Sequence, residues 1–283
     1  MEQESISGSE IELCEAMKYM DSINKESVNL VLTDPPYITS RKTGMDSLHK
    51  NVALLKEQKK DAKTEEEWEQ WTAMENNKGK VFSDVQKKNY MKWGTIYGKK
   101  YAVVTDYGNW DTSFTIEMLE SIVKEYYEKL VKGGTCIIFF DLWKITKLKD
   151  IMEDVGFKQI RFIEWIKTNP QPLNSGTNYL TNAREIALLG VKGAKPTFNS
   201  KYDNGLYYYP LQGGAQRFHP TQKNEKMFED LIKKHSNEGD VVLDTFMGSG
   251  TTAVACKTTK RVYKGCEANE EYHKKSEERI SRF

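Results

Sequence analysis

The chain has 283 residues, a length that suits one large α/β domain with a smaller appendage. Apolar residues make up 38% of it and charged residues 29%, so a substantial core can form beneath a highly charged surface. The 42 Lys and Arg against 41 Asp and Glu give a formal net charge of +1, which excludes a uniformly basic nucleic-acid-binding coat but not a local basic face.

Four short apolar runs predict buried parallel strands, and each run ends on or beside an acidic residue. In chain order, they are 28–32 with Asp34, 135–140 with Asp141, 241–243 with Asp244 and 261–266 with Glu267. Apolar stripes with helical spacing lie at 116–130 and 227–232, and Gly133 and Gly239 stand where the helices are expected to stop. Ligands of open α/β sheets bind beyond the carboxyl ends of the strands, so the four acids mark a candidate site.

Two further apolar runs, 161–166 and 185–189, flank a loop rich in Asn and Pro. They predict a long antiparallel hairpin at the edge of the sheet.

Two segments that combine basic with aromatic residues break the alternation of strands and helices. Within the insertion 41–104, the stretch 41–100 has 14 Lys and Arg against 9 Asp and Glu, and it includes Trp68, Trp71, Tyr90, Trp93 and Tyr97. Within 192–223, the basic residues are Lys192, Lys195, Lys201, Arg217 and Lys223, against the single acid Asp203. This composition suits a polyanion that offers flat faces, although the aromatics can equally form a core beneath solvated lysines.

The segment 244–253, DTFMGSGTTA, is a glycine-rich turn between an apolar strand and an apolar helix. Gly248 and Gly250 allow a tight turn and the close approach of a ligand. Glu267 ends the following strand, where an acid binds ribose hydroxyls in nucleotide-binding βαβ units. No Lys follows the glycines, which excludes a Walker phosphate loop, so the pattern indicates a nucleoside site.

A second turn, Asp34-Pro35-Pro36-Tyr37, follows the predicted strand 28–32. Its prolines lack backbone N–H groups and fix an extended turn, so it presents carbonyls, a carboxylate and an aromatic ring with few donors. This arrangement suits a planar ligand with an NH2 group, whose two hydrogens Asp34 and the Pro35 carbonyl accept while Tyr37 stacks on the ring. The alternative is an ordinary Pro-Pro loop with a capping aspartate.

Together the two turns resemble motifs of the S-adenosylmethionine-dependent DNA amino-methyltransferases, and their order is similar to that of the permuted beta class. The segment 219–223, HPTQK, resembles the one that precedes the glycine loop in that class. Residues 165–170 resemble its hairpin motif, and 265–272 its ribose-binding strand. Residues 11–13 resemble the strand of that class whose acid meets the adenine of the cofactor. This match is looser, because the usual Gly-Asp is absent. The resemblance covers 1–40 and 105–283, and 41–104 departs from it.

The resemblance implies a Rossmann-like methyltransferase fold, with a seven-stranded mixed sheet and helices on both faces. It implies a catalytic domain at 1–40, 105–191 and 218–283. The insertion 41–104 is then a lid or a DNA contact, and 192–217 is a candidate target-recognition region. The implied catalytic residues are Asp34, Pro35, Pro36 and Tyr37, and those implied for S-adenosylmethionine are Asp244, Phe246, Gly248, Gly250, Thr251, Glu267, Thr221 and Glu12.

The function implied is methyl transfer to N6 of a flipped-out adenine in double-stranded DNA. Aspartate at the head of the proline turn is more typical of adenine enzymes, but a cytosine-N4 enzyme, an RNA methyltransferase and a non-catalytic nucleic-acid-binding module stay open. Cytosine C5 chemistry is excluded, because it needs an attacking thiolate, typically after a proline, and none of the four Cys follows one. The scattered Cys and His predict no metal site.

No stretch approaches the roughly 18 consecutive apolar residues of a membrane helix, and the first twenty residues show no secretory signal. We therefore expect a soluble protein, bacterial or phage-encoded, that acts on DNA in the cytoplasm. No nuclease or helicase segment is visible, so a cognate restriction enzyme would be a separate protein. The sequence leaves open whether such a partner exists and whether the chain forms a homodimer.

Overall fold

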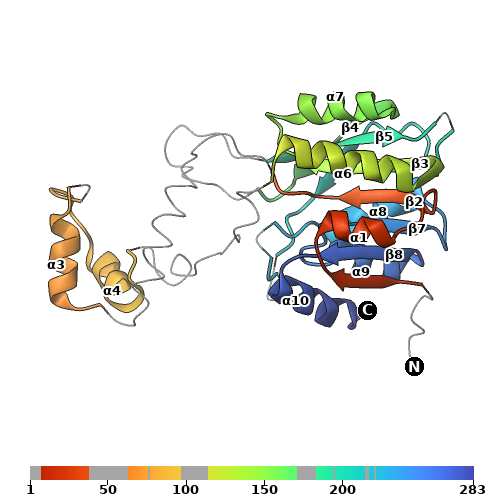
Figure 1. Ribbon diagram of the computed structural model, residues 1–283. Helices are drawn as coiled ribbons and strands as arrows, with labels where there is room; N and C mark the ends of the chain where they lie inside the picture. The colour runs from red at the N-terminus through yellow and green to blue at the C-terminus, as the bar shows by residue number, and fades with distance from the viewer. Residues whose placement is uncertain are drawn as a thin grey trace. The chain divides into compact units, whose positions relative to one another are not determined.

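The computed structural model describes residues 8–37, 63–75, 77–96, 114–170, 183–193, 195–213, 217–219 and 221–283. The chain divides into two compact units, one formed by Met1–Ile38 with Asn109–Phe283 and the other by Thr39–Gly108. The first unit is built on a mixed sheet (Figure 1). None of the described helices has the length and apolar character that a membrane span requires.

The sheet has eight described strands, in the spatial order β1-β8-β7-β2-β3-β5-β4-β6. Their bounds are β1 Glu10–Leu13, β2 Val28–Thr33, β3 Leu130–Phe140, β4 Lys158–Lys167, β5 Arg184–Val191, β6 Leu206–Tyr209, β7 Val241–Asp244 and β8 Val262–Glu267. Strand β5 pairs antiparallel with both β3 and β4, and the other pairings are parallel. The mixed α/β fold is thus confirmed, with eight strands instead of the seven expected.

Helices cover both faces of this sheet (Figure 1). On one face lie α1 (Ala16–Ser22), α6 (Ile116–Lys129) and α7 (Ile145–Val155), whose apolar stripes share one core cluster with the strands. On the other face lie α8 (Glu225–His235) and α9 (Thr251–Thr259), and α10 (Glu270–Ile280) packs on α9 through Ile280. Strands buried on both sides explain why their sequences are continuous apolar runs.

Gly133 was predicted to stop a helix, and this prediction is wrong. Helix α6 ends at Lys129 and passes directly into β3, so Gly133 lies within the strand and does not stop the helix. Its φ is +85°, and a Cβ there would lie 2.4 Å from the carbonyl oxygen of Lys195. Gly133 is therefore needed for the close approach of the segment that follows β5. Gly239, also at φ +85°, lies in the turn between α8 and β7.

The predicted hairpin is confirmed as β4 and β5, which pair antiparallel with Ile163 opposite Ala187. It is not the outermost pair, because β6 adds to the free side of β4. Since β5 is reversed, its first residues lie at the edge of the sheet where β2, β3, β4, β7 and β8 end. We call this the carboxyl edge.

The candidate target-recognition region 192–217 crosses from one edge of the sheet to the other. Its first part is held at the opposite, amino edge, where the Asn199 side chain donates to the carbonyls of Lys233 and Ser236 after α8. It then forms β6, a strand that the sequence did not predict, and reaches the carboxyl edge at Tyr209. Only from Tyr209 onward do its described residues lie at the carboxyl edge, where Leu211 N donates to Asn169 Oδ1 at 2.6 Å.

The second unit has a small core of its own. It is described at 63–75 and 77–96, where α3 (Glu65–Ala73) and α4 (Asp84–Trp93) each begin with a capping box, Thr64 with Glu67 and Ser83 with Gln86. Ring contacts at centroid separations of 4.9 to 5.5 Å join Trp68, Trp71, Phe82 and Tyr90. These aromatics therefore pack on one another inside the unit. Tyr97 and the side chain of Trp93 lie outside the described part of the chain.

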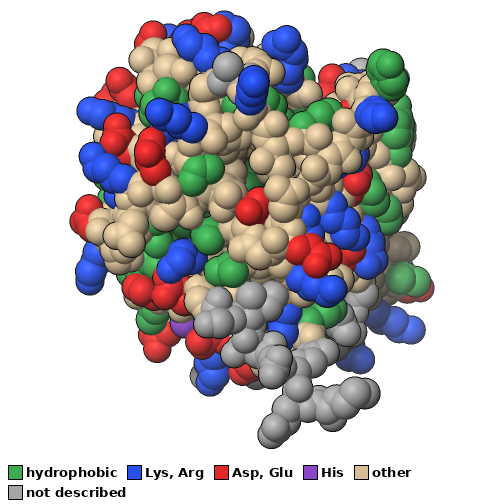
Figure 2. Space-filling model, turned by 90° about the vertical axis from the view of Figure 1, so that its right-hand side faces the viewer, with side chains coloured by type: hydrophobic (Ala, Val, Ile, Leu, Met, Phe, Trp, Pro, Cys, Tyr) green, Lys and Arg blue, Asp and Glu red, His purple; other side chains and the backbone are tan. Residues whose placement is uncertain are grey.

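The amino edge of the sheet carries charges of both signs. Figure 2 looks onto the side where the parallel strands begin, and there Lys and Arg side chains are interspersed with Asp and Glu. Such a mixture creates no extended field of one sign.

Candidate active site

Two neighbouring strands form the floor of the site. Strands β2 and β7 pair in parallel, and the next described helices of the sheet unit, α6 and α9, cover opposite faces of the sheet. Ligands of open α/β sheets bind beyond the carboxyl ends of the strands at such a point. Asp34 follows β2 and Asp244 ends β7, so the two predicted acids lie on neighbouring strands at this edge.

Asp244 is bonded on both of its carboxylate oxygens. Its Oδ1 accepts hydrogen bonds from Thr33 Oγ1 at 2.7 Å and Phe246 N at 3.1 Å, and its Oδ2 accepts from Thr252 Oγ1 at 2.5 Å. Burial raises the pKa of this carboxyl to about 6, although the hydrogen bonds act in the opposite direction. Asp244 therefore ties β2, the glycine loop and α9 together.

The glycine loop takes the conformation that its glycines allow. Gly248 has φ +50°, and Gly250, the N-cap of α9, has φ +73°. Gly248 N donates to Glu267 Oε2 at 2.8 Å, which fixes the loop to the end of β8. The other oxygen of Glu267 accepts from Asn269 N, and burial raises the pKa of this carboxyl. The loop and the predicted ribose-binding acid are thus adjacent.

Two other predicted cofactor residues also support the loop from behind. Thr251 is buried, and its hydroxyl contacts Ser249 Oγ at 3.1 Å and Arg279 Nη1 at 3.2 Å. Phe246 is half-buried and packs edge-to-face on Phe114 at 5.7 Å between ring centroids. These contacts give both residues a role in holding the shape of the loop.

The segment before α8 folds over the glycine loop. A Cβ on Gly248 would lie 3.3 Å from His219 Nε2, and the His219 ring lies 4.5 Å from that of Tyr272. Burial, with the nearby cations Lys223 and Arg217, lowers the pKa of His219 to about 4, so the ring is neutral at pH 7. Its Nδ1 accepts from Thr221 N at 3.3 Å, and Thr221 itself is exposed. Pro220 lies outside the described residues.

The proline turn has unmet hydrogen-bonding capacity. Pro35 and Pro36 are buried, and Tyr37 packs edge-on against Phe140 at 6.0 Å between ring centroids. Among the described residues, the buried atoms Asp34 Oδ1 and Tyr37 OH have no hydrogen-bond partner. Both amide atoms of the buried Gln222 are also without one in this part of the chain. Buried polar groups are normally paired, so these atoms make the turn a candidate place for a ligand.

Sequence reasoning missed the lysine that contacts Asp34. Lys223 Nζ donates to Asp34 Oδ2 at 2.6 Å and to Glu185 Oε2 at 2.8 Å, and Lys167 Nζ lies 2.8 Å from Glu185 Oε1. Burial raises the pKa of Asp34, and Lys223 opposes that effect. Burial alone would also raise the pKa of Glu185, but Lys223 and Lys167 hold it below its usual value. The signals available were the place of Lys223 in HPTQK and an acid, Glu185, at the head of an apolar strand.

Glu12 stands apart from this group. It lies on the edge strand β1, is exposed, and pairs in register with Cys266 of β8. Strands β8 and β7 separate it from β2 and the proline turn. Its position next to β8 puts it on the Glu267 side of the site.

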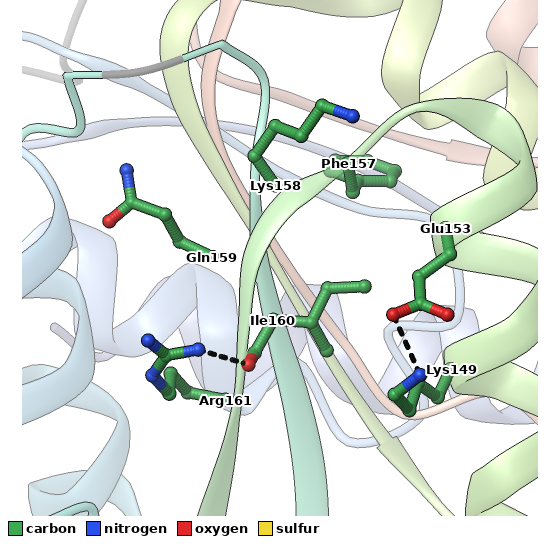
Figure 3. A pocket seen from close by; sticks show the side chains of 7 residues that line it. All are labelled: Lys149, Glu153, Phe157, Lys158, Gln159, Ile160 and Arg161. Atoms are coloured by element: carbon green, nitrogen blue, oxygen red, sulfur yellow. Dashed lines mark hydrogen bonds and ion pairs between the residues drawn. The ribbon is translucent and has the colours of Figure 1, made fainter.

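A surface hollow of about 580 Å³ lies elsewhere. It is lined by the end of α7 and the start of β4, with Lys149, Glu153, Phe157, Lys158, Gln159, Ile160 and Arg161 (Figure 3). Because β4 begins here, the hollow lies at the amino edge, and it shares no residue with the proline turn or the glycine loop. Among the described residues, no cluster of His, Cys, Asp and Glu has the make-up of a metal site.

The chain is similar to known proteins over a span that includes both turns. A family model described as DNA methylase, whose name couples N6 with N4 transfer, matches residues 28–278. The chain belongs to this DNA methylase family. The methylase is 32% identical over 199 residues to the type II methyltransferase M2.DpnII of Streptococcus pneumoniae, covering 63% of this chain and 73% of that protein. It is 25% identical over 287 residues to M2.LlaDCHI of Lactococcus lactis subsp. cremoris, covering 95% and 87%.

Solved structures share the fold of the methylase. The M1.HpyAVI–SAM complex matches with a TM-score of 0.60 at 23% identity, over 96% of this chain and 98% of that one. The PvuII DNA methyltransferase, described as cytosine-N4-specific, matches with a TM-score of 0.65 at 16% identity, over 99% and 88%. At these identities the likeness shows the fold alone.

Proposed function

We propose that this DNA methylase transfers a methyl group from S-adenosylmethionine to N6 of a flipped-out adenine in double-stranded DNA. The observation that carries the proposal is the proline turn. It holds a buried carboxylate whose Oδ1 has no partner among the described residues, next to prolines that have no N–H to donate. An acceptor-rich turn of this kind suits the exocyclic amino group of a nucleobase.

The glycine loop fits the cofactor. Gly248 and Gly250 hold left-handed conformations without a Cβ, and each oxygen of Glu267 accepts one backbone hydrogen bond and keeps a lone pair for a ribose hydroxyl. We propose that Asp244, Phe246, Gly248, Gly250, Thr251 and Thr221 bind or shape the methionine end, Glu267 the ribose and Glu12 the adenine end. When bound, S-adenosylmethionine supplies an electrophilic methyl group on a sulfonium.

The chain's residues make the amino nitrogen reactive by position. Its lone pair is delocalised into the base, and acceptors on both of its hydrogens favour a more tetrahedral nitrogen. We assign these acceptors to Asp34 Oδ1 and the Pro35 carbonyl. This is catalysis by orientation and electrostatics, and it needs no covalent nucleophile. The described cysteines agree, because burial raises the pKa of the Cys136, Cys256 and Cys266 thiols.

Tyr37 supports the flipped base. Extruding a nucleotide from a duplex costs a few kcal/mol, and stacking on an aromatic ring returns about 1–3 kcal/mol. Tyr37 is half-buried, and we propose that its ring stacks on the base. Basic residues of the insertion 41–104 and, within 192–217, Arg217, which follows Tyr209, are proposed to contact phosphates.

The experiment that tests this function is labelling of unmethylated bacterial genomic DNA with isotope-labelled S-adenosylmethionine, followed by digestion and mass spectrometry of the nucleosides. We expect label in N6-methyladenine, and sequencing of the product then gives the recognition site. Label in N4-methylcytosine would keep the mechanism and replace the base. Binding of the cofactor without label in any DNA base would contradict a DNA substrate.

A further inference from the structure

Four charged side chains form a chain of ion pairs at the carboxyl edge. They run in the order Asp34, Lys223, Glu185, Lys167, with successive N–O distances of 2.6, 2.8 and 2.8 Å. Between 7% and 20% of each side chain is exposed. The four residues come from the turn after β2, the segment before α8, the start of β5 and the end of β4. The reversed strand β5 is what brings Glu185 to this edge.

Such a cluster is a poor way to stabilise a fold. Removing charges from water carries a large desolvation cost for each ion, and apolar replacements of a buried ion pair are often equally stable or better. The cluster therefore calls for a role besides stability. Its one open position is Oδ1 of Asp34, the atom that faces no partner among the described residues.

Lys223 determines which oxygen of Asp34 is open. The ammonium donates to Asp34 Oδ2 and Glu185 Oε2, and it also lies 5.4 Å from the centroid of the Phe139 ring and 6.0 Å from that of Tyr37. Rotating the Asp34 carboxylate would break the 2.6 Å ion pair, in which only 7% of the Lys223 side chain and 19% of the Asp34 side chain are exposed. Lys223 directly precedes Asn224, whose side chain caps the N-terminus of α8, so its backbone is held at the start of this helix.

We propose that Lys223 is a positioning residue that ties Oδ2 of Asp34 and keeps this carboxylate charged, so that Oδ1 is presented to the amino group of the target base. The inference rests on the proposed function and adds a residue to it. Glu185 and Lys167 serve as the support, since Glu185 fixes the Lys223 ammonium and Lys167 offsets the charge of Glu185.

The charges around Asp34 decide the sign of the expected effects. Burial raises the pKa of Asp34, Lys223 lowers it, Glu185 raises it, and the nearby Tyr37 hydroxyl also lowers it. Asp244 and Asp141, at the ends of β7 and β3, add negative charge to the same edge, and Tyr37 lies beside Asp34. Without Lys223, the groups around the Asp34 carboxyl are acids and a phenol, so its pKa should rise. Without the charge of Glu185, Lys223 pairs with Asp34 only, so the pKa of Asp34 should fall.

The test is a pH titration of Asp34 by carbon-13 NMR of protein labelled at the Asp carboxyl carbons, with the Asp34 signal assigned by its loss in Asp34→Asn. In Lys223→Met we expect the midpoint to rise by about one to three pH units, the usual effect of an opposite charge at this range. In Glu185→Gln we expect it to fall. Equal midpoints in the three proteins would overturn the proposal, and Glu185→Gln still tests it should Lys223→Met fail to fold.

Turnover on genomic DNA completes the test. In Lys223→Met the acidic limb of kcat should move to higher pH with the NMR midpoint, and KM for S-adenosylmethionine should stay within about threefold. A lower kcat with an unmoved pH profile would leave Lys223 with a merely structural role. Wild-type protein that methylates no base would refute the proposed function, while the NMR midpoints would still report on the ion pair between Lys223 and Asp34.

Discussion

Asp34 and Asp244, which follow or end neighbouring strands, differ in how fully their carboxylate oxygens are hydrogen-bonded. Asp244 accepts three hydrogen bonds on its two oxygens, whereas Asp34 accepts one ion pair on Oδ2 and has Oδ1 without a partner among the described residues. Hydrogen bonds on both oxygens suit Asp244 to holding the strands and the loop together, whereas the open oxygen of Asp34 leaves it poised for a ligand. The division gives each acid a separate test.

Replacing Asp34 by alanine should remove turnover but not cofactor binding. We expect kcat of Asp34→Ala to fall at least about a hundredfold, the scale of losing one preorganised hydrogen-bonding group. Calorimetric affinity for S-adenosylmethionine should stay within about threefold, because the glycine loop lies on other strands. Asp141→Ala, the same change at the end of β3, is the matched control and should keep most activity. Lost cofactor binding with chemistry intact at saturation would contradict the assignment.

Asp244 should impose a pH dependence on stability. Its pKa is about 6 in the folded protein and near 4 when unfolded, so the folded state binds a proton more tightly. Stability from this group is present in full below pH 4 and is lost as pH rises to about 6, a difference of about 3 kcal/mol.

Asp244→Asn should remove this loss. We expect the free energy of unfolding of the variant, minus that of the wild type, to grow by about 2 kcal/mol between pH 4 and pH 7, because half of the unfolded-state carboxyl is already ionised at pH 4. Urea unfolding followed by circular dichroism measures it at each pH, and the subtraction cancels the other carboxyls. A difference that stays flat across this range would show that Asp244 is not held at a raised pKa.

At the scale of elements, the continuous apolar runs predicted the central strands and the hairpin because burial on both faces leaves a strong signal. Strand β6 has the short sequence LYYY, and it pairs with residues of β4 that lie 42 positions earlier, such as Glu164 opposite Leu206. Lys223 and Glu185 are 38 residues apart, and no local pattern links them. The motifs thus indicated Asp34 and the loop but not the ion pairs around Asp34.

The close approach at Gly133 can be separated from its backbone conformation. Gly133 and Gly239 both have φ +85°, but a Cβ on Gly239 would meet nothing within 4 Å. Gly239→Ala should therefore cost only the left-handed conformation, about 1–2 kcal/mol. Gly133→Ala must also displace the Lys195 carbonyl and should cost about 1–3 kcal/mol more by urea unfolding. Equal losses in the two variants would show that this segment moves aside freely.

At the scale of the whole molecule, the described residues of the second unit form contacts within that unit. Its described aromatics pack on one another, and its helices carry their own caps. The excess of Lys and Arg over acids within 41–100 is therefore the feature of this unit that suits binding of DNA phosphates. Phosphate binding by such residues depends on the salt concentration, which provides a measurable signature.

Replacing residues 41–104 by a Gly/Ser linker should weaken the electrostatic part of DNA binding. We expect the plot of log affinity against log salt to become shallower by about one for each phosphate that the variant no longer neutralises. Fluorescence anisotropy with labelled duplex measures this, and unchanged affinity for S-adenosylmethionine is the control that the sheet unit has folded. An unchanged slope would refute the hypothesis that this insertion grips DNA.

The pairing of β1 with β8 also bears on how the protein is made. Strand β2, with the turn that would hold the base, leaves the ribosome long before β7 and β8, which carry Asp244, the glycine loop and Glu267. Until those strands are synthesised, β1 has no partner and β2 lacks one neighbour. On the proposed assignment of the cofactor residues, a nascent chain therefore lacks the cofactor site and cannot methylate the nucleic acid around it. Competence to methylate arrives only with the last strand of the sheet.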